Sequence, residues 1–160
     1  MFVATDLEGL TKPELYRTLQ QQLRALIDGE PDPIANMANS AALIFHSVPR
    51  LNWAGFYILK GNELVLGPFQ GKPACVRIAV GSGVCGAAAK KREILRVNDV
   101  TQFPGHIACD SESRSEIVFP LINRDTLIGV LDLDSPEPNR FDSEDETGLA
   151  VIAKLIGAKI

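Results

Sequence analysis

The side chains best suited to chemistry in this sequence are three cysteines and a group of three acids. Cys109 lies in a polar loop that precedes two strand-like segments of the chain. Alternate residues of a strand share one face, so Asp132 and Asp134 of the second segment point the same way, among apolar neighbours. Glu116 opens the first segment in the same manner, directly before an apolar run. Because a stable core does not favour carboxylates, the pattern predicts a small polar site built against apolar walls.

The cysteines are suited to thiol redox chemistry, to metal ligation or to burial as small apolar side chains. Their number is odd and no secretion signal is visible, which argues against a structural disulfide framework. Cys75, Cys85, His106 and Cys109 could supply four zinc ligands, but no two of the cysteines have the close spacing typical of structural zinc sites.

Local chemistry favours Cys85 as the nucleophile. Cys85 lies in the first turn of a short predicted helix, where backbone N–H groups and the helix dipole favour the thiolate. Cys109 is flanked by Asp110 and Glu112, whose charges disfavour its thiolate unless Arg114 or His106 offsets them.

A glycine-rich turn at Gly81, Gly83 and Gly86 has the spacing of a dinucleotide-binding fingerprint, and it follows a strand and opens a helix. Asp99 lies near the place that a ribose-binding acid would occupy. The helix is short, however, and the chain lacks the repeated strand–helix alternation of a nucleotide-binding fold. We therefore interpret the motif as a tight turn, whose free N–H groups could hold a ligand carboxylate.

Length and composition are those of a globular protein. The chain has 160 residues, of which 46% are hydrophobic and 22% charged, so it can bury a core without covalent staples. The net charge is −4 and the longest basic run is Lys90 to Arg92, so no nucleic-acid partner is expected. No signal peptide or membrane span is visible, and a cytoplasmic location follows as the default expectation.

Hydrophobic periodicity predicts an α+β fold. Helices are expected from Thr11 to about Ile27, from Asp32 to before Pro49, and after a cap at residues 141–145. Strands are expected at residues 52–60, 63–67, 74–80, 93–97, 113–124 and 126–135, with a short helix after Gly83. This order predicts a largely antiparallel sheet covered by helices on one side.

Three motifs and the spacing of the cysteines carry a family resemblance. The motifs are NWAGFY at residues 52–57, GHIACDSESRSEIVFPL at 105–121 and GVLDLDSP at 129–136, and the cysteines are ten and twenty-four residues apart. In these features the chain resembles the free methionine-(R)-sulfoxide reductases, which are built on the GAF domain. The resemblance covers nearly the whole chain and implies a single GAF domain over residues 1–160. It further implies about six antiparallel strands, helices packed on one face and a ligand pocket on the other.

The resemblance also implies roles for the candidate residues. Cys109 is implied as the catalytic thiol, and Cys85 and Cys75 as the partners that form and pass on a disulfide, in an order that the sequence leaves open. The implied substrate-binding residues are Trp53, Tyr57, Glu116, Asp132 and Asp134. The reaction expected is reduction of free methionine sulfoxide through a cysteine sulfenic acid, with thioredoxin as the reductant and no metal or cofactor.

Within that scheme the acids have two expected uses. Glu116, crowded by Asp132 and Asp134, is the candidate for protonating the departing sulfoxide oxygen. The surplus negative charge suits the ammonium group of a free amino acid, which a peptide-bound residue lacks.

Two other functions fit parts of the sequence. A non-catalytic GAF sensor would bind a small molecule even with all three cysteines replaced, and a cysteine-rich metal-binding module would contain metal when purified. The sequence leaves open whether the chain forms a homodimer.

Overall fold

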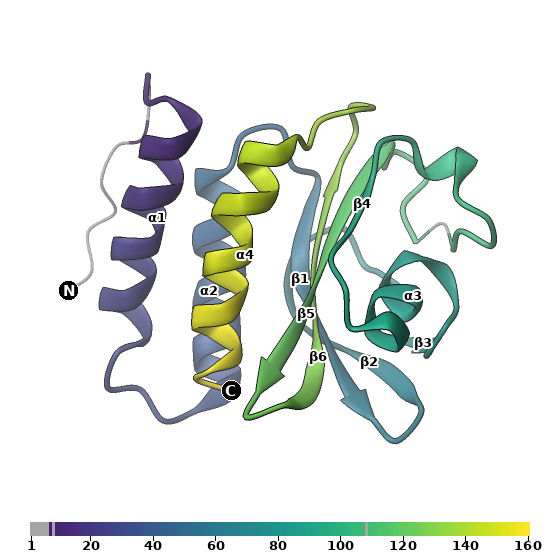
Figure 1. Cartoon of the computed structure of the whole chain (residues 1–160), viewed down its shortest axis with the longest axis horizontal. Coiled ribbons are helices and arrows are strands. Elements are labelled where there is room, and N and C mark those ends of the chain that lie inside the picture. The colour runs from purple at the N-terminus through teal and green to yellow at the C-terminus, as the bar shows by residue number, and fades with distance from the viewer. Residues whose placement is uncertain (1–6, 8, 108) are drawn as a thin grey trace.

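A six-stranded sheet divides the molecule into two faces, with helices on both of them (Figure 1). The computed structural model describes residues 7, 9–107 and 109–160. The strands lie in the order β3-β2-β1-β6-β5-β4, and all neighbouring pairs are antiparallel. Their bounds are β1 Trp53–Lys60, β2 Glu63–Gly71, β3 Arg77–Ala79, β4 Leu95–Val97, β5 Ser115–Asn123 and β6 Thr126–Ser135.

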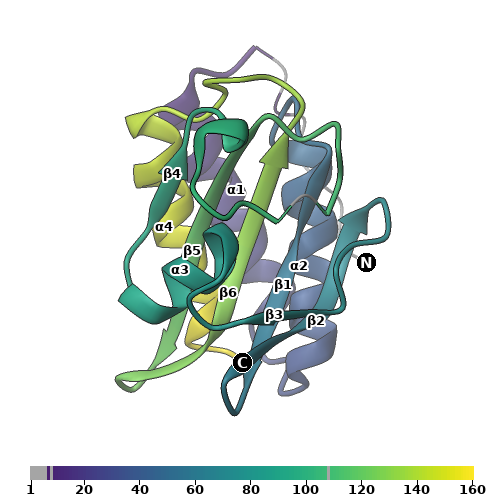
Figure 2. The same cartoon turned by 90° about the vertical axis from the view of Figure 1, so that its right-hand side faces the viewer.

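Three helices form two layers on one face of the sheet. The helices α2 (Pro33–Ser47) and α4 (Ser143–Gly157) lie against the strands, and α1 (Lys12–Ile27) lies outside them (Figure 1). The fourth helix, α3 (Gly83–Lys91), lies on the opposite face. Figure 2 looks onto that face, where α3 and the chain between β4 and β5 pass in front of the sheet.

The helix starts follow from capping chemistry. The backbone N–H of Thr11 donates to the Glu14 carboxylate at 3.0 Å, which completes a capping box at the start of α1. Asp32 accepts from the N–H of Ala35 at 2.8 Å and precedes the proline that opens α2. Asp142 caps α4 in the same way. These caps confirm the predicted starts of the three large helices.

Successive side chains of the central strands point alternately into two separate hydrophobic cores, one on each face of the sheet. On β5, Ile117 and Phe119 point into the core beneath α2 and α4, whereas Val118 points into the core on the α3 side. On β6, Leu131 and Leu133 face the helical core, which leaves Asp132 and Asp134 on the α3 side. The predicted α+β fold with a largely antiparallel sheet is confirmed. The alternation also places the acids on the α3 side of the sheet.

A buried ionic network joins α1 to the start of α4. Asp145 is fully buried and accepts from the Tyr16 hydroxyl at 2.6 Å, from Lys12 at 2.7 Å and from the Arg140 guanidinium at 3.0 Å. Burial and the hydrogen bond to Asp145 raise the pKa of Tyr16 far above its ordinary value. Because the four groups satisfy one another, the network can hold the two helices together in spite of its burial.

The predicted strand at residues 74–80 is wrong in its first half. Only Arg77–Ala79 forms a strand, and Cys75 lies in the loop before it. Pro73 has no N–H for a sheet ladder, and the loop carbonyls are bonded by side chains of β1 instead. The strand expected at 63–67 continues to Gly71, and the strand expected at 93–97 begins only at Leu95.

None of the helices in the described part of the chain is long and apolar enough to cross a membrane.

Candidate active site

The register of three neighbouring strands brings the predicted acids together. Glu116 of β5 pairs with Asp134 of β6, which in turn pairs with Trp53 of β1. Asp132 lies two residues from Asp134 on β6, between Val118 and Gly55, and on the same face. The prediction that the three acids share one face is therefore confirmed, and Trp53 lies beside them.

A pocket opens over these rows, on the α3 side of the sheet. The predicted site residues that line it are Trp53, Tyr57, Cys85, Cys109, Glu116, Asp132 and Asp134. Cys75 does not line the pocket but forms a disulfide with Cys109, which does. The structure therefore brings all the predicted residues into one place.

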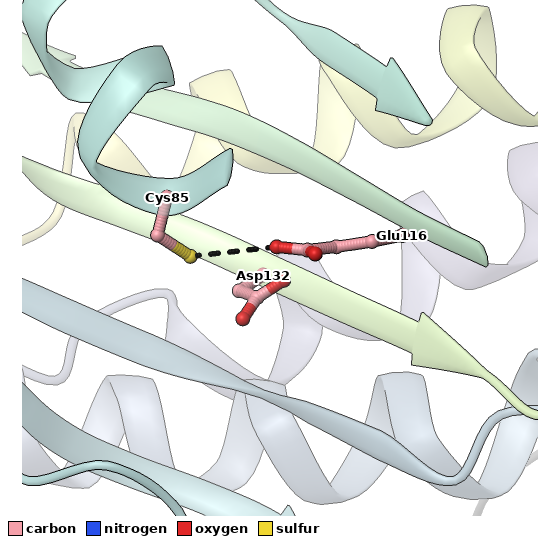
Figure 3. Close-up of side chains that lie close together, drawn as sticks. All are labelled: Cys85, Glu116 and Asp132. Carbon is pink, nitrogen blue, oxygen red and sulfur yellow. Dashed lines mark hydrogen bonds between the residues drawn. The ribbon is translucent and has the colours of Figure 1, made fainter. Parts of the chain in front are cut away.

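The pocket floor is a cluster of one thiol and two carboxyl groups (Figure 3). Cys85 projects from α3, Glu116 from β5 and Asp132 from β6, and each is at least nine-tenths buried. The thiol donates to Glu116 Oε1 at 3.8 Å, and the ligand atoms of all three lie within 4.8 Å of one another. Such a set could also coordinate a divalent cation, since thiolate and carboxylate oxygen are both metal ligands.

Burial and mutual repulsion raise the pKa values of the three acids. Burial raises the pKa of Glu116 well above its ordinary value, and the charges of Asp132 and Asp134 raise it further. Burial raises the pKa of Asp132 to about 7, and it also raises the pKa of Asp134, on which the Asp132 charge acts in the same direction. The shift favours the protonated form of Glu116, which is the form that can donate a proton.

The expectation that Cys85 has a stabilised thiolate is wrong. Burial raises the pKa of the Cys85 thiol well above its ordinary value, and the charges of Asp132 and Glu116 act in the same direction. A helix N-terminus contributes only about 0.3–1 kcal/mol to an exposed anion, which is too little to offset desolvation and two nearby carboxyl groups. Cys85 is therefore a protonated thiol in this pocket.

Two buried polar atoms of the pocket lack partners among the residues that the structure describes. They are Oδ1 of Asp132 and Nδ1 of His106. Burial lowers the pKa of His106, which favours the neutral form of its ring. A buried polar group without a partner costs about 1–3 kcal/mol, so the pocket is suited to a ligand that supplies polar partners.

The disulfide joins two loops at the pocket. Cys75 belongs to the loop between β2 and β3, and Cys109 to the segment between the 3₁₀-helix η1 (Val100–Gln102) and β5. Their Cα atoms are 5.4 Å apart, and Cys85 remains a free, buried thiol. In the state described here Cys109 is thus paired with Cys75 rather than with Cys85.

The two aromatic residues of the pocket support the loop that carries Cys75. The Trp53 Nε1–H donates to the Lys72 carbonyl at 3.1 Å, and the Tyr57 hydroxyl donates to the Cys75 carbonyl at 3.0 Å. The Trp53 and Tyr57 rings also stack, with centroids 5.9 Å apart. A Cβ at Gly55 would lie 2.6 Å from the indole, so glycine at this position lets the ring lie across the strand.

The glycine-rich turn has a structural use at this site. Gly83 adopts φ +59° at the start of α3 and lines the pocket, and a Cβ at Gly86 would lie 2.4 Å from the Ala79 carbonyl oxygen. Asp99 accepts from the N–H of Thr101 and caps η1. These contacts agree with the interpretation of the motif as a tight turn.

The sequence reasoning missed Asn52 and Ser113, and gave Asp110 no positive role. Asn52 Nδ2 donates to Ser113 Oγ at 3.0 Å and to Asp110 Oδ2 at 3.3 Å, which anchors the loop after Cys109 beside β1. Both ends of this anchor lie in the quoted motifs, at residues 52–57 and 105–121, so their position near the cysteine was the available signal.

Comparison with known proteins agrees with this geometry. A sequence model of the GAF domain matches residues 14–160. The free methionine-R-sulfoxide reductase of Escherichia coli (strain K12) is 51% identical over 147 residues, which are 91% of this chain and 90% of the relative. The chain belongs to the GAF-domain family of free methionine-R-sulfoxide reductases. The resemblance found in the three motifs is therefore confirmed.

Solved structures of this family superpose closely on the chain. The free methionine-R-sulfoxide reductase from Neisseria meningitidis, in complex with its substrate, has a TM-score of 0.94 at 42% identity, over 99% of this chain and 95% of that one. The reduced form of fRMsr of Staphylococcus aureus has a TM-score of 0.88 at 49% identity, over 90% of this chain and 94% of that one. The GAF architecture expected from the resemblance, with its six-stranded antiparallel sheet, is confirmed. The expectation that the helices pack on one face holds for α1, α2 and α4, whereas α3 lies on the face that carries the pocket.

Proposed function

We propose that this protein reduces free methionine (R)-sulfoxide to methionine through a sulfenic acid on Cys109 and a disulfide with Cys75. The observation that carries the proposal is the disulfide itself, which lies at a pocket whose floor holds an acid, Glu116, with a raised pKa. Family membership supports the same reaction, since relatives about half identical to this chain are named for it.

Cys109 is the nucleophile in this scheme. It lines the pocket and is half-buried, so a substrate sulfur can reach it once the disulfide is reduced. Cys85 is less suited to attack, because burial and the neighbouring carboxyl groups keep its thiol protonated. Cys85 instead donates its S–H to Glu116 and helps to orient that carboxyl group.

Glu116 supplies the proton that the reaction needs. The Cys109 thiolate attacks the sulfoxide sulfur, and the sulfoxide oxygen takes a proton from Glu116, since an unprotonated oxygen would leave poorly. The oxygen then moves to the Cys109 sulfur as the bonds from the substrate sulfur to oxygen and to Cys109 break, so that Cys109 becomes a sulfenic acid and the thioether of methionine is released. The substrate sulfur is reduced by two electrons and the cysteine sulfur is oxidised by two.

Cys75 then resolves the sulfenic acid. Its thiol condenses with the Cys109 sulfenic acid, a sulfur–sulfur bond forms and one water leaves. An external dithiol, for which we propose thioredoxin in the cytoplasm, reduces the disulfide by thiol exchange and returns both thiols. The sum of the steps is methionine sulfoxide and a dithiol giving methionine, a disulfide and water.

The acids also select the free amino acid. An ammonium group can donate to the unpartnered Oδ1 of Asp132, and its positive charge would favour the ionised forms of Asp132 and Asp134. Backbone N–H groups at the start of α3, where Ser82 and Gly83 line the pocket, are suited to the substrate carboxylate. A peptide-bound residue lacks the ammonium charge and would leave the acids unpaired.

Replacement of each cysteine tests the assignment. With dithiothreitol as reductant, Cys109→Ser should abolish methionine formation, whereas Cys75→Ser should retain a first turnover. With thioredoxin as reductant, Cys75→Ser should lose recycling. Cys85→Ser should still form the Cys75–Cys109 disulfide. The assignment is overturned if Cys109→Ser keeps the first turnover while Cys85→Ser loses it.

A further inference from the structure

The two loops that the disulfide joins are also joined by opposite charges. Lys72, three residues before Cys75, forms ion pairs with Glu112 and with Asp110, whose Oδ2 is 3.7 Å from the ammonium nitrogen. Asp110 follows Cys109 directly in the chain. The ion pairs therefore connect the same two segments as the sulfur–sulfur bond, immediately beside it.

Both ends of this contact are anchored to the pocket. The Lys72 carbonyl accepts from the Trp53 indole N–H at 3.1 Å. On the other side, Asp110 accepts from Asn52 through Oδ2 and from the backbone N–H of Glu112 through Oδ1, at 3.3 and 2.9 Å. Both loops are bonded to residues at the start of β1. The ion pairs of Lys72 therefore hold the two loops at a fixed separation and do not merely join two mobile side chains.

We propose that Lys72 is a positioning residue for the disulfide step, holding the Cys75 loop against the Cys109 loop when the two sulfurs are not bonded. This inference rests on the function proposed above. The step is the condensation of the Cys75 thiol with the Cys109 sulfenic acid, in which the sulfur–sulfur bond forms and the sulfenic oxygen leaves as water with the thiol proton. The opposite charges remain after reduction, so they keep the effective concentration of Cys75 high near Cys109.

The same contact must then stabilise the disulfide. An ion pair that forms best when the Cys75 loop lies against the Cys109 loop stabilises the disulfide relative to the dithiol. The stabilisation equals the free energy that the ion pair contributes in this arrangement. Lys72 and Glu112 are more than half exposed, with side-chain exposures of 56% and 64%, so the effect is small, whereas Asp110 is 10% exposed and less screened. We expect about a threefold effect on both the closure rate and the redox equilibrium, which for a two-electron couple corresponds to about 14 mV.

The test replaces the charge of Lys72 and compares three variants with the parent protein. Lys72→Met removes the charge, Lys72→Arg keeps it, and Lys154→Met is a matched control on the exposed face of α4. The reduced protein is mixed with one equivalent of free methionine sulfoxide, and methionine formation is followed separately from disulfide closure. Trp53, the single tryptophan, reports closure by fluorescence because its indole is bonded to the Cys75 loop.

We expect Lys72→Met to form methionine at the parent rate but to close the disulfide about threefold more slowly, with a longer-lived sulfenic acid that dimedone traps. Lys72→Arg and Lys154→Met should behave as the parent, and high salt should remove the difference between the parent and Lys72→Met. Equal closure rates in Lys72→Met and the parent at low salt would overturn the proposal. So would a slower closure that Lys72→Arg shares, because the charge would then not be the cause.

The redox equilibrium gives a reading that does not depend on the reductase activity. The Cys75–Cys109 disulfide is equilibrated with reduced and oxidised dithiothreitol, without methionine sulfoxide, and Lys72→Met should shift the equilibrium about threefold toward the dithiol. This shift is expected even if the protein reduces some other substrate. An unchanged equilibrium constant in Lys72→Met would contradict the role of Lys72 while leaving the proposed reaction untouched.

Discussion

Replacing Asp132 by asparagine should stabilise the protein at alkaline pH while impairing its activity. Asp132 is 6% exposed, and burial raises its pKa from 3.8 to about 7. Between these values the folded protein holds a proton that the unfolded chain has released. The free energy of unfolding therefore falls as pH rises through this interval. A difference of about three pH units corresponds to about 4 kcal/mol at 1.36 kcal/mol per unit, as an upper bound.

Asparagine keeps the shape of the side chain and cannot ionise, so the variant avoids this cost. Removing the Asp132 charge should also lower the pKa of Glu116 and Asp134, which adds to the stabilisation at high pH. We expect Asp132→Asn to differ little from the parent near pH 4 and to be more stable by up to about 4 kcal/mol at pH 8, or about 8–16 °C in Tm for a chain of this size.

The assay is urea unfolding of the oxidised protein at pH 4, 6 and 8, with Asp125→Asn, in the exposed turn between β5 and β6, as the control. The control should show no pH-dependent gain over the parent. An Asp132→Asn variant that is equally destabilised at all three pH values would refute the argument, because Asp132 would then contribute no pH dependence to the free energy of unfolding.

Two further predictions concern the acids and the substrate. Glu116→Gln should lower the rate of the chemical step by about a hundredfold or more, with little effect on substrate binding. Because Glu116 must be protonated to act, the rate of the parent protein should fall as pH rises through the elevated pKa of Glu116. A Glu116→Gln rate within threefold of the parent rate would remove Glu116 from this role. N-acetyl methionine sulfoxide should have a kcat/KM up to about ten-thousandfold below that of the free amino acid. Asp134→Asn should lower the kcat/KM of the free amino acid and so reduce the difference between the two substrates. Comparable kcat/KM values for both substrates in the parent protein would contradict the use of the acids to bind the ammonium group.

Local pattern predicted the acid face of the sheet because alternation is a property of each strand by itself. Asp132 and Asp134 had to share a face once β6 formed, and Glu116 joined them because a hairpin pairs neighbouring strands. The large helices were predictable for a similar reason, since Thr11 and Asp142 cap them through contacts within one turn.

The state of Cys85 was not predictable from local sequence. Its position in the first turn of α3 suggests a low pKa, but α3 packs over β5 and β6, so the thiol faces Glu116 and Asp132 from distant parts of the chain. The pKa is set by these tertiary neighbours and by burial, neither of which appears in the spacing of the motif.

Other features depended on contacts between distant segments. Pairing of Cys75 with Cys109 spans 34 residues and requires that the loop after β2 reach the loop before β5. The network around Asp145 joins residues up to 133 positions apart, and only the packing of α1 on α4 brings them together. Neither arrangement leaves a short-range pattern.

The most direct test of the account is a single turnover of the reduced protein with an excess of L-methionine sulfoxide, as a mixture of its (R) and (S) sulfur epimers, and no added reductant. The account predicts one methionine per chain, consumption of the (R) epimer alone as shown by chiral chromatography, and a Cys75–Cys109 disulfide with Cys85 free, as shown by peptide mass mapping. Formation of methionine with no disulfide between Cys75 and Cys109, or with Cys85 oxidised in place of Cys75, would contradict the proposed mechanism. Absence of methionine altogether would contradict the proposed function.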